Sequence, residues 1–169
     1  MHPNAAPPAT ATLAQLAAVD AIVARLRELP GALLPILHAI QEQLGFVPAD
    51  ALEPIAHALN LSRAEVHGVL TFYHDFRTSP PGRTVVKLCR AEACQAVGCV
   101  ALEARLAERH GVAMGATSAD GALTLEPVYC LGNCALGPSA LVDGQLVGRL
   151  DAAAIDRLVA DAKARGGAR

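Results

Sequence analysis

All five cysteines of this 169-residue chain lie between positions 89 and 134, and the first 88 residues contain none. Four of them form two close pairs, Cys89 with Cys94 and Cys130 with Cys134, and Cys99 is the fifth. An odd number of cysteines without secretory features is not typical of structural disulfides. The distribution therefore predicts that the second half of the chain needs sulfur, as metal ligands or as redox groups.

Three kinds of site could use these thiols. A structural zinc site takes four thiolates around one ion, with spacings of about two to four residues inside each pair. A [2Fe–2S] cluster also takes four thiolates, two on each iron. A redox dithiol favours Cys-x-x-Cys, which this sequence lacks. The spacing favours the cluster, but it leaves the zinc ion open as an alternative.

The runs that precede the cysteine pairs predict that the pairs converge. Residues 84–88 and 123–128 are typical of strands, and each run leads directly to one pair. An amphipathic helix over residues 97–110 would join them as a crossover between parallel strands. Loops at the carboxyl ends of neighbouring parallel strands lie side by side, so the two pairs should meet at one site.

The rest of the second half completes an α/β pattern. Asp143-Gly144 is a strong hairpin signal between short strands over residues 139–142 and 145–147. A helix over residues 151–163, with Asp151 as its N-cap, follows. The predicted order β-α-β-β-β-α suits a thioredoxin-like sheet.

The first half is helical by its period. Apolar residues three or four apart predict four short helices, over residues 12–29, 33–44, 52–59 and 62–73. The last of these has the clearest start, because Ser62 and Glu65 form a capping box. Residues 78–82 break every pattern and are interpreted as a linker.

The composition argues against several functions. The formal charge is −2, Trp is absent, and Phe and Tyr together number only five, so nucleic-acid binding is not predicted. No stretch of about 18 uncharged apolar residues occurs, so no membrane contact is expected. The first twelve residues lack the basic and apolar regions of a secretory signal, and we expect a cytoplasmic protein with a disordered Pro/Ala tail over residues 1–12.

Two independent motifs resemble one known family. The segment Glu65-Val66-His67-Gly68-Val69-Leu70-Thr71-Phe72-Tyr73 is similar to the pre-linker signature of thioredoxin-like [2Fe–2S] subunits. These subunits belong to respiratory complex I, to bidirectional NAD-linked hydrogenases and to NAD-linked molybdenum formate dehydrogenases. The spacing of the two cysteine pairs also matches, and the resemblance covers residues 30–162. The run from Cys89 to Gln95 looks most like the gamma subunit of the soluble formate dehydrogenases.

The resemblance implies a cofactor and its ligands. It implies one [2Fe–2S] cluster, and its ligands would be Cys89, Cys94, Cys130 and Cys134. Together with the composition, the helical period and the linker, it leads us to expect three segments, namely the disordered tail over 1–12, a helical docking domain over 13–77 and a thioredoxin-like [2Fe–2S] ferredoxin domain over 82–165.

The resemblance also implies partners. The chain would be a non-catalytic electron-transfer subunit of an NAD-dependent formate dehydrogenase. It would exchange single electrons with the FMN of a partner NAD-binding flavoprotein, in a complex with a molybdenum-containing catalytic subunit. No Gly-x-Gly-x-x-Gly follows a strand, so NAD binding by this chain itself is not predicted. The alternatives are the equivalent subunit of complex I or of a hydrogenase, a zinc-bound adaptor, and a free ferredoxin-like shuttle.

Several neighbours of the four cysteines carry smaller expectations. Cys99 is predicted to be a small buried residue at the start of the following helix rather than a ligand. Lys87 and Arg90 would offset the negative charge of a cluster. Gly98, Gly132 and Gly137 would permit tight turns in the ligand loops. The sequence leaves open whether Pro138 follows a cis peptide bond.

Overall fold

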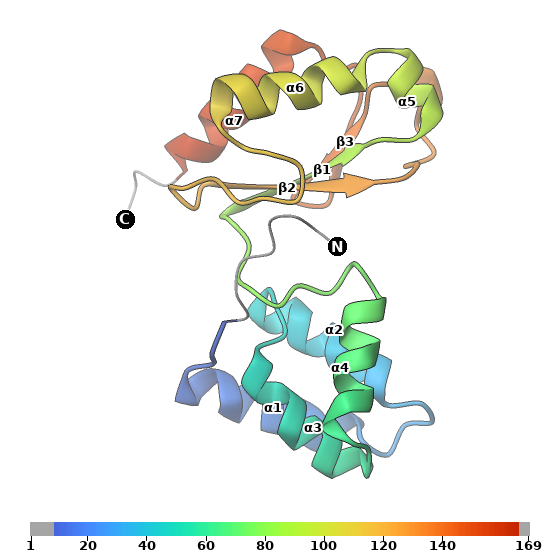
Figure 1. The fold of residues 1–169 in the computed structure, drawn as a ribbon, viewed down its shortest axis with the longest axis vertical. Helices are drawn as coiled ribbons and strands as arrows, with labels where there is room; N and C mark the ends of the chain where they lie inside the picture. Colours follow the sequence, from blue (N-terminus) through green and yellow to red (C-terminus); the bar gives the residue numbers. More distant parts are fainter. Residues whose placement is uncertain (1–8, 166–169) are drawn as a thin grey trace. The chain divides into compact units, whose positions relative to one another are not determined.

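The computed structural model describes residues 9–165, which form two compact units, residues 9–80 and residues 81–165 (Figure 1). Each unit has its own hydrophobic core. The core of the first unit is built only from residues 19–76 and the cores of the second only from residues 86–162. No helix among the described residues is long and apolar enough to cross a membrane.

The first unit contains the four predicted helices. They are α1 (Leu13–Leu26), α2 (Leu33–Leu44), α3 (Leu52–Leu59, after a 3₁₀ turn at Ala49–Ala51) and α4 (Arg63–Phe72). Thr12 and Ser62 each form a capping box that satisfies free N–H groups at a helix start. Helix α1 ends earlier than predicted, and Leu29 lies beyond it, half exposed.

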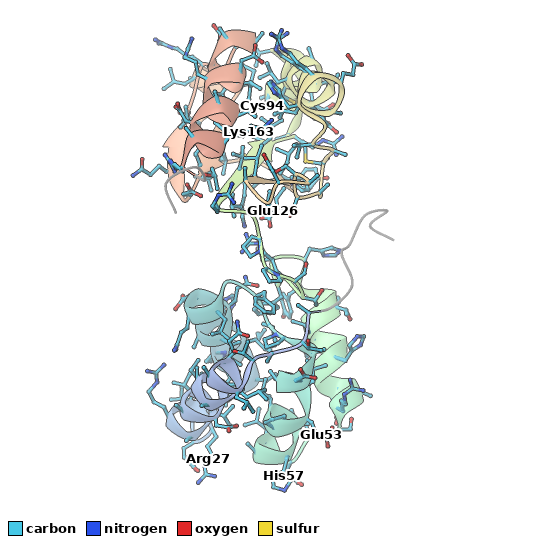
Figure 2. The ribbon with its side chains drawn as sticks, turned by 90° about the vertical axis from the view of Figure 1, so that its left-hand side faces the viewer. Arg27, Glu53, His57, Cys94, Glu126 and Lys163 are labelled. Atoms are coloured by element: carbon cyan, nitrogen blue, oxygen red, sulfur yellow. The ribbon has the colours of Figure 1, made fainter. Side chains whose placement is uncertain are left out.

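The helical core is apolar and its polar side chains face outward. Ile36, Leu37 and Ile55 are fully buried in the core. Glu53 and His57, on the opposite side of α3, are exposed and point away from the unit (Figure 2). The alternation explains why the 3.6-residue period located these helices.

The segment before α1 differs in part from the expected disordered tail. Residues 1–8 lie outside the described residues. Residues 9–12 are held by hydrogen bonds, from Ala9 N–H to the Thr78 carbonyl (3.0 Å) and from Ala11 N–H to Asp50 Oδ2 (2.9 Å). Composition did not predict this, because the bonds use backbone donors, which any residue except proline supplies.

The second unit has the predicted thioredoxin-like order with one additional helix. Its elements are β1 (Thr84–Cys89), α5 (Glu92–Ala96), α6 (Cys99–His110), β2 (Leu123–Val128), β3 (Ala140–Val142), β4 (Gln145–Val147) and α7 (Ala152–Ala164). The strand order is β2-β1-β3-β4, with β1 and β2 parallel and the other two pairs antiparallel. Helices α6 and α7 lie on the same side of this sheet (Figure 1). Helix α5 was not predicted, since five residues are too few to show a helical period.

The register of the parallel pair positions the cysteine loops. Thr84 pairs with Leu123 and Cys89 with Val128, so β1 and β2 begin and end together. The residues that follow the two strands therefore leave the sheet at the same edge.

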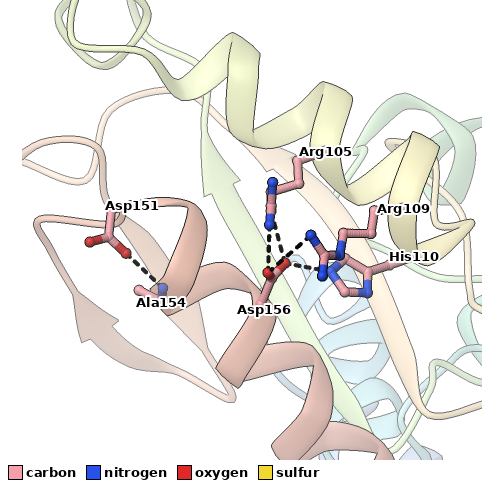
Figure 3. A network of polar contacts seen from close by, with 6 residues as sticks. All are labelled: Arg105, Arg109, His110, Asp151, Ala154 and Asp156. Atoms are coloured by element: carbon pink, nitrogen blue, oxygen red, sulfur yellow. Dashed lines mark hydrogen bonds and ion pairs between the residues drawn. The ribbon is translucent and has the colours of Figure 1, made fainter.

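A polar cluster joins the two helices that cover the sheet. Asp156 on α7 accepts two hydrogen bonds from Arg105 on α6, at 2.8 and 2.6 Å, and lies 2.8 Å from Nε2 of His110 (Figure 3). Arg109 lies 3.8 Å from the same carboxylate. The Arg105 and His110 contacts hold the pKa of Asp156 well below its usual range. A bidentate Arg–carboxylate contact of this kind fixes geometry as well as charge.

Replacement of Asp156 with asparagine is expected to lower the melting temperature by a few degrees at pH 7. Because the folded-state pKa is depressed, the carboxylate stabilises the fold above the ordinary aspartate pKa of about 3.9 and loses this effect as pH falls. The difference in melting temperature between wild type and Asp156→Asn should therefore shrink between pH 7 and pH 3. Thermal unfolding followed by circular dichroism measures it.

The matched control for this prediction is Asp161→Asn, the same change at an exposed position on the same helix. Its effect on the melting temperature should be small at every pH. Equal effects of the two substitutions would contradict a specific role of the Asp156 cluster.

Candidate metal centre

The first cysteine pair is buried at the end of β1. Cys89 is the last residue of β1, and both Cys89 and Cys94 are only 2% exposed. Cys94 lies within α5 and not in an open loop as predicted. The short helix folds back after the strand, so the side chain of Cys94 returns towards Cys89.

The second pair lies in an irregular turn after β2 and is exposed. Cys130 has a φ of 74°, and Gly132 has the same φ, so the backbone is left-handed at both. Cys134 begins a 3₁₀ turn that ends at Leu136. Left-handed backbone at Cys130 is unfavourable for a side chain other than glycine, asparagine or aspartate, so the local fold holds it in place.

The structure brings the thiols together in pairs. The thiol of Cys89 is in hydrogen-bond contact with that of Cys94, and the thiol of Cys130 with that of Cys134. Cys89 also acts electrostatically on Cys134, across the two loops. The expected convergence of the two loops at one edge of the sheet is therefore present in the geometry.

Backbone amides stabilise a negative charge on Cys89. Burial alone raises the pKa of the Cys89 thiol, but N–H groups of Ala91, Cys130 and Leu131 and the thiol of Cys94 donate to its sulfur. The net result is a pKa below the usual value for a thiol. Two of these amides belong to the second ligand loop, so that loop solvates a sulfur of the first pair.

The thiols of Cys94 and Cys134 respond to their neighbours in the opposite direction. Burial raises the pKa of Cys94, as does the adjacent Cys89 thiol, while the N–H of Ser139 donates to the Cys94 sulfur. The neighbouring Cys130 raises the pKa of Cys134. Once one sulfur of such a pair is ionised, the other is harder to ionise unless a cation is present to compensate.

The donor set suits a two-iron centre. A [2Fe–2S] cluster needs two thiolates on each iron, and the four cysteines are arranged as two contacting pairs. The N–H groups aimed at Cys89 and Cys94 are the kind of donors that thiolates bound to iron accept.

Lys87 and Arg90 do not act as unpaired positive charges beside the cysteines. Lys87 Nζ lies 3.7 Å from Glu126 Oε2, and Arg90 Nε lies 3.0 Å from Glu103 Oε2. Their role beside a cluster stays a prediction: the positive charge of Arg90 opposes the rise in the pKa of the nearby Cys99 thiol, although each of the two bases is paired with a carboxylate. Sequence spacing could not show this, since Glu103 and Glu126 come from α6 and β2.

The remaining neighbours were predicted with mixed success. Cys99 is 1% exposed at the start of α6, as predicted, and it packs in one apolar cluster with Cys89 and Cys94. Gly137 serves close packing rather than a left-handed turn, because its φ is −68° and a Cβ there would lie 3.1 Å from Val97 Cγ2 and 3.3 Å from the Cys134 carbonyl oxygen. The peptide bond before Pro138, left open by the sequence, is cis. Sequence reasoning did not single out Ser139, which hydrogen-bonds to both ligand loops.

Comparison with known proteins gives a consistent result. Residues 19–163 match the profile of the thioredoxin-like [2Fe–2S] ferredoxin family. A subunit of the NADH-quinone oxidoreductase of Rhizobium meliloti (strain 1021) is 37% identical over 141 residues, which cover 83% of this chain and 84% of that protein. The corresponding NADH-quinone oxidoreductase protein of Escherichia coli (strain K12) is 32% identical over 162 residues, covering 94% of this chain and 98% of that protein.

Solved structures include a similar fold in a larger chain. In the crystal structure of an NAD⁺-reducing [NiFe]-hydrogenase in the air-oxidized state, one chain matches with a TM-score of 0.68 and 32% identity. The match covers 83% of this chain but only 24% of the hydrogenase chain, so this protein spans about a quarter of that relative.

Proposed function

The chain belongs to the thioredoxin-like [2Fe–2S] ferredoxin family, and we propose that it is the electron-transfer subunit of an NAD-linked oxidoreductase complex. Its cofactor is a [2Fe–2S] cluster, which takes up and releases one electron at a time. The observation that carries this proposal is the meeting of two cysteine pairs at the shared end of two paired parallel strands.

The ligands in this proposal are Cys89, Cys94, Cys130 and Cys134. The buried pair, Cys89 and Cys94, would hold the inner side of the cluster, and the exposed pair, Cys130 and Cys134, the side nearest solvent. Tyr129 is 70% exposed next to this outer pair. The outer side is therefore the accessible route for an electron to or from a partner. We infer that this partner is a flavoprotein subunit that carries FMN and binds NAD.

The parent complex is proposed to be a cytoplasmic NAD-dependent formate dehydrogenase with a molybdenum-containing subunit. The support is the similarity of Cys89-Arg90-Ala91-Glu92-Ala93-Cys94-Gln95 to the gamma subunit of such enzymes. The equivalent subunit of NADH-quinone oxidoreductase is the second candidate. It is favoured by the relative from Escherichia coli, which aligns with the chain over nearly its whole length.

Purification of the tagged protein from its native host tests both proposals. We expect an FMN-containing NAD-binding subunit to co-purify together with a molybdenum-containing, formate-oxidising one. Recovery with quinone-reducing membrane subunits, or with a nickel hydrogenase, would refute the formate assignment and retain the family role. Recovery of a colourless protein that contains zinc would refute the electron-transfer role itself.

The helical unit is proposed to dock this subunit onto the flavoprotein. Phe72 is 73% exposed and Tyr73 44% exposed at the end of α4, whereas Phe76 is buried. A shallow apolar groove of about 500 Å³ adjoins Tyr73 and is lined in part by Leu33, Leu61 and other apolar residues. Exposed aromatic residues beside an apolar groove are typical of the centre of an interface.

Replacement of Phe72 and Tyr73 with alanine is expected to weaken the complex by at least about tenfold, because exposed interface aromatics commonly contribute more than about 1 kcal/mol. The visible spectrum should not change. Affinity for the flavoprotein subunit, measured by surface plasmon resonance, checks the first expectation and absorbance the second.

The matched control for docking is Leu13→Ala, at an apolar residue of the same unit that is 87% exposed. It should leave affinity unchanged. Loss of colour together with loss of affinity in the aromatic variant would show that Phe72 and Tyr73 support the fold instead.

A further inference from the structure

We propose that Ser139, together with Asn133, is a positioning pair that holds the two ligand loops at the spacing the cluster requires. The inference rests on the proposed ligand set and deepens it. Ser139 lies between the exposed ligand turn and β3, and it is 1% exposed. Its hydroxyl forms hydrogen bonds with the second ligand loop, and its backbone forms hydrogen bonds with the first ligand pair.

The hydroxyl of Ser139 fixes the second ligand loop. It accepts a hydrogen bond from Asn133 Nδ2 at 3.0 Å and lies 3.3 Å from the Leu136 carbonyl and 3.4 Å from the Asn133 carbonyl, to which it can donate. Asn133 immediately precedes the ligand Cys134, and Leu136 ends the 3₁₀ turn that Cys134 begins. The buried hydroxyl of Ser139 thus contacts residues at both ends of the turn that carries Cys134.

The backbone of Ser139 fixes the first ligand pair. Its carbonyl accepts from the N–H of Cys89 at 2.9 Å, and its own N–H donates to the sulfur of Cys94. Ser139 is therefore hydrogen-bonded on one side to Cys89 and Cys94 and on the other to the turn of Cys134. A shift of this residue would change the distance between the two pairs.

The surroundings leave the second loop little freedom to adjust. A Cβ at Gly148 would lie 2.7 Å from Asn133 Nδ2 and 2.7 Å from the Leu136 carbonyl, so the backbone of Gly148 packs directly on both residues. The N–H of Arg149 donates to the Leu136 carbonyl at 2.6 Å. Without the serine hydroxyl, Asn133 Nδ2 would lose its acceptor in this packed position, which costs free energy and favours movement of the loop.

The experiment compares Ser139→Ala and Asn133→Ala with Ser118→Ala, all in the full-length protein loaded with iron and sulfide. Ser118 is the matched control, because its buried hydroxyl also bridges a loop, accepting from Leu123 N–H and donating to Asp120. It lies in the loop before β2, at the end of that strand away from the cysteines. Ser139→Ala keeps the backbone bonds to Cys89 and Cys94 and removes only the tie to the second loop.

The expected result is a faster loss of iron and an altered cluster environment. In excess EDTA, the half-life of the visible absorption should fall about tenfold in Ser139→Ala and in Asn133→Ala, the lower end of what loss of such a supporting hydrogen bond costs a metal site. The visible circular dichroism and the midpoint potential should shift in both. Ser118→Ala should lower the melting temperature and leave the half-life, the dichroism and the midpoint potential unchanged. Ser139→Thr keeps the hydroxyl and should have the half-life of the wild-type protein.

Two other outcomes separate the inference from the proposed function. If Ser139→Ala and Asn133→Ala keep the wild-type dichroism, potential and half-life, the positioning role is overturned while the cluster stays assigned. If Ser139→Ala does not fold, Asn133→Ala alone decides the inference by the same three readouts. If the wild-type protein holds no iron and sulfide, the proposed function fails first, and the inference falls with it.

Discussion

Replacement of Cys89 with serine is expected to remove the visible absorption of the purified protein and to lower its iron content from about two atoms per chain to nearly none. Cys89 sits at the end of β1, buried, with N–H groups of both ligand loops directed at its sulfur. A serine hydroxyl is a poor iron ligand at neutral pH because it does not ionise there. The same loss, or a strongly altered spectrum, is expected for serine at Cys94, Cys130 or Cys134.

Cys99 supplies the matched control for this prediction. It is as buried as Cys89 and Cys94, and it packs in the same apolar cluster. Burial raises the pKa of the Cys99 thiol, and the nearby Cys89 reinforces this, so Cys99 stays protonated. Cys99→Ser should therefore leave iron and sulfide at about two each per chain. The ligand assignment is wrong if Cys99→Ser bleaches the protein and serine at one of the other four positions leaves the visible spectrum unchanged.

Local patterns predicted the elements of the fold well. Strand β2 was predicted with both of its bounds, and Gly45 and Gly111 end α2 and α6 in the left-handed conformation that glycine favours. These features depend on residues within a few positions of one another. The family resemblance added the cofactor, which spacing alone left open between a cluster and zinc.

Contacts between distant residues could not be predicted in the same way. The pairing of Arg90 with Glu103 depends on how α6 packs against the first ligand loop, and no local pattern reports it. Ser139 resembles an ordinary residue before a short strand in the sequence, and only its burial between two loops shows its hydrogen bonds. Sequence reasoning therefore identified the proposed ligands, but it did not identify the residues that set their spacing.

A fragment that begins at Ser79 is expected to fold and to hold the cluster without the helical unit. All four proposed ligands, all four strands and the helices α5, α6 and α7 lie beyond this point. The buried residues of the second unit, among them Leu88, Leu125 and Ile155, come from that unit alone. A domain of this size buries a modest core, so binding of the cluster should add to its stability.

Iron and sulfide analysis with visible absorption measures the outcome. The fragment should show the spectrum of the full-length protein, and the same fragment with Cys130→Ser should be colourless. The fragment should have lost its affinity for the flavoprotein, because the helical unit is proposed to supply that affinity. Residues 1–78 alone should be helical by circular dichroism and colourless, because their core is built only from residues 19–76. A fragment without iron, beside a full-length protein that takes up iron under the same conditions, would show that the helices form part of the structure that holds the cluster.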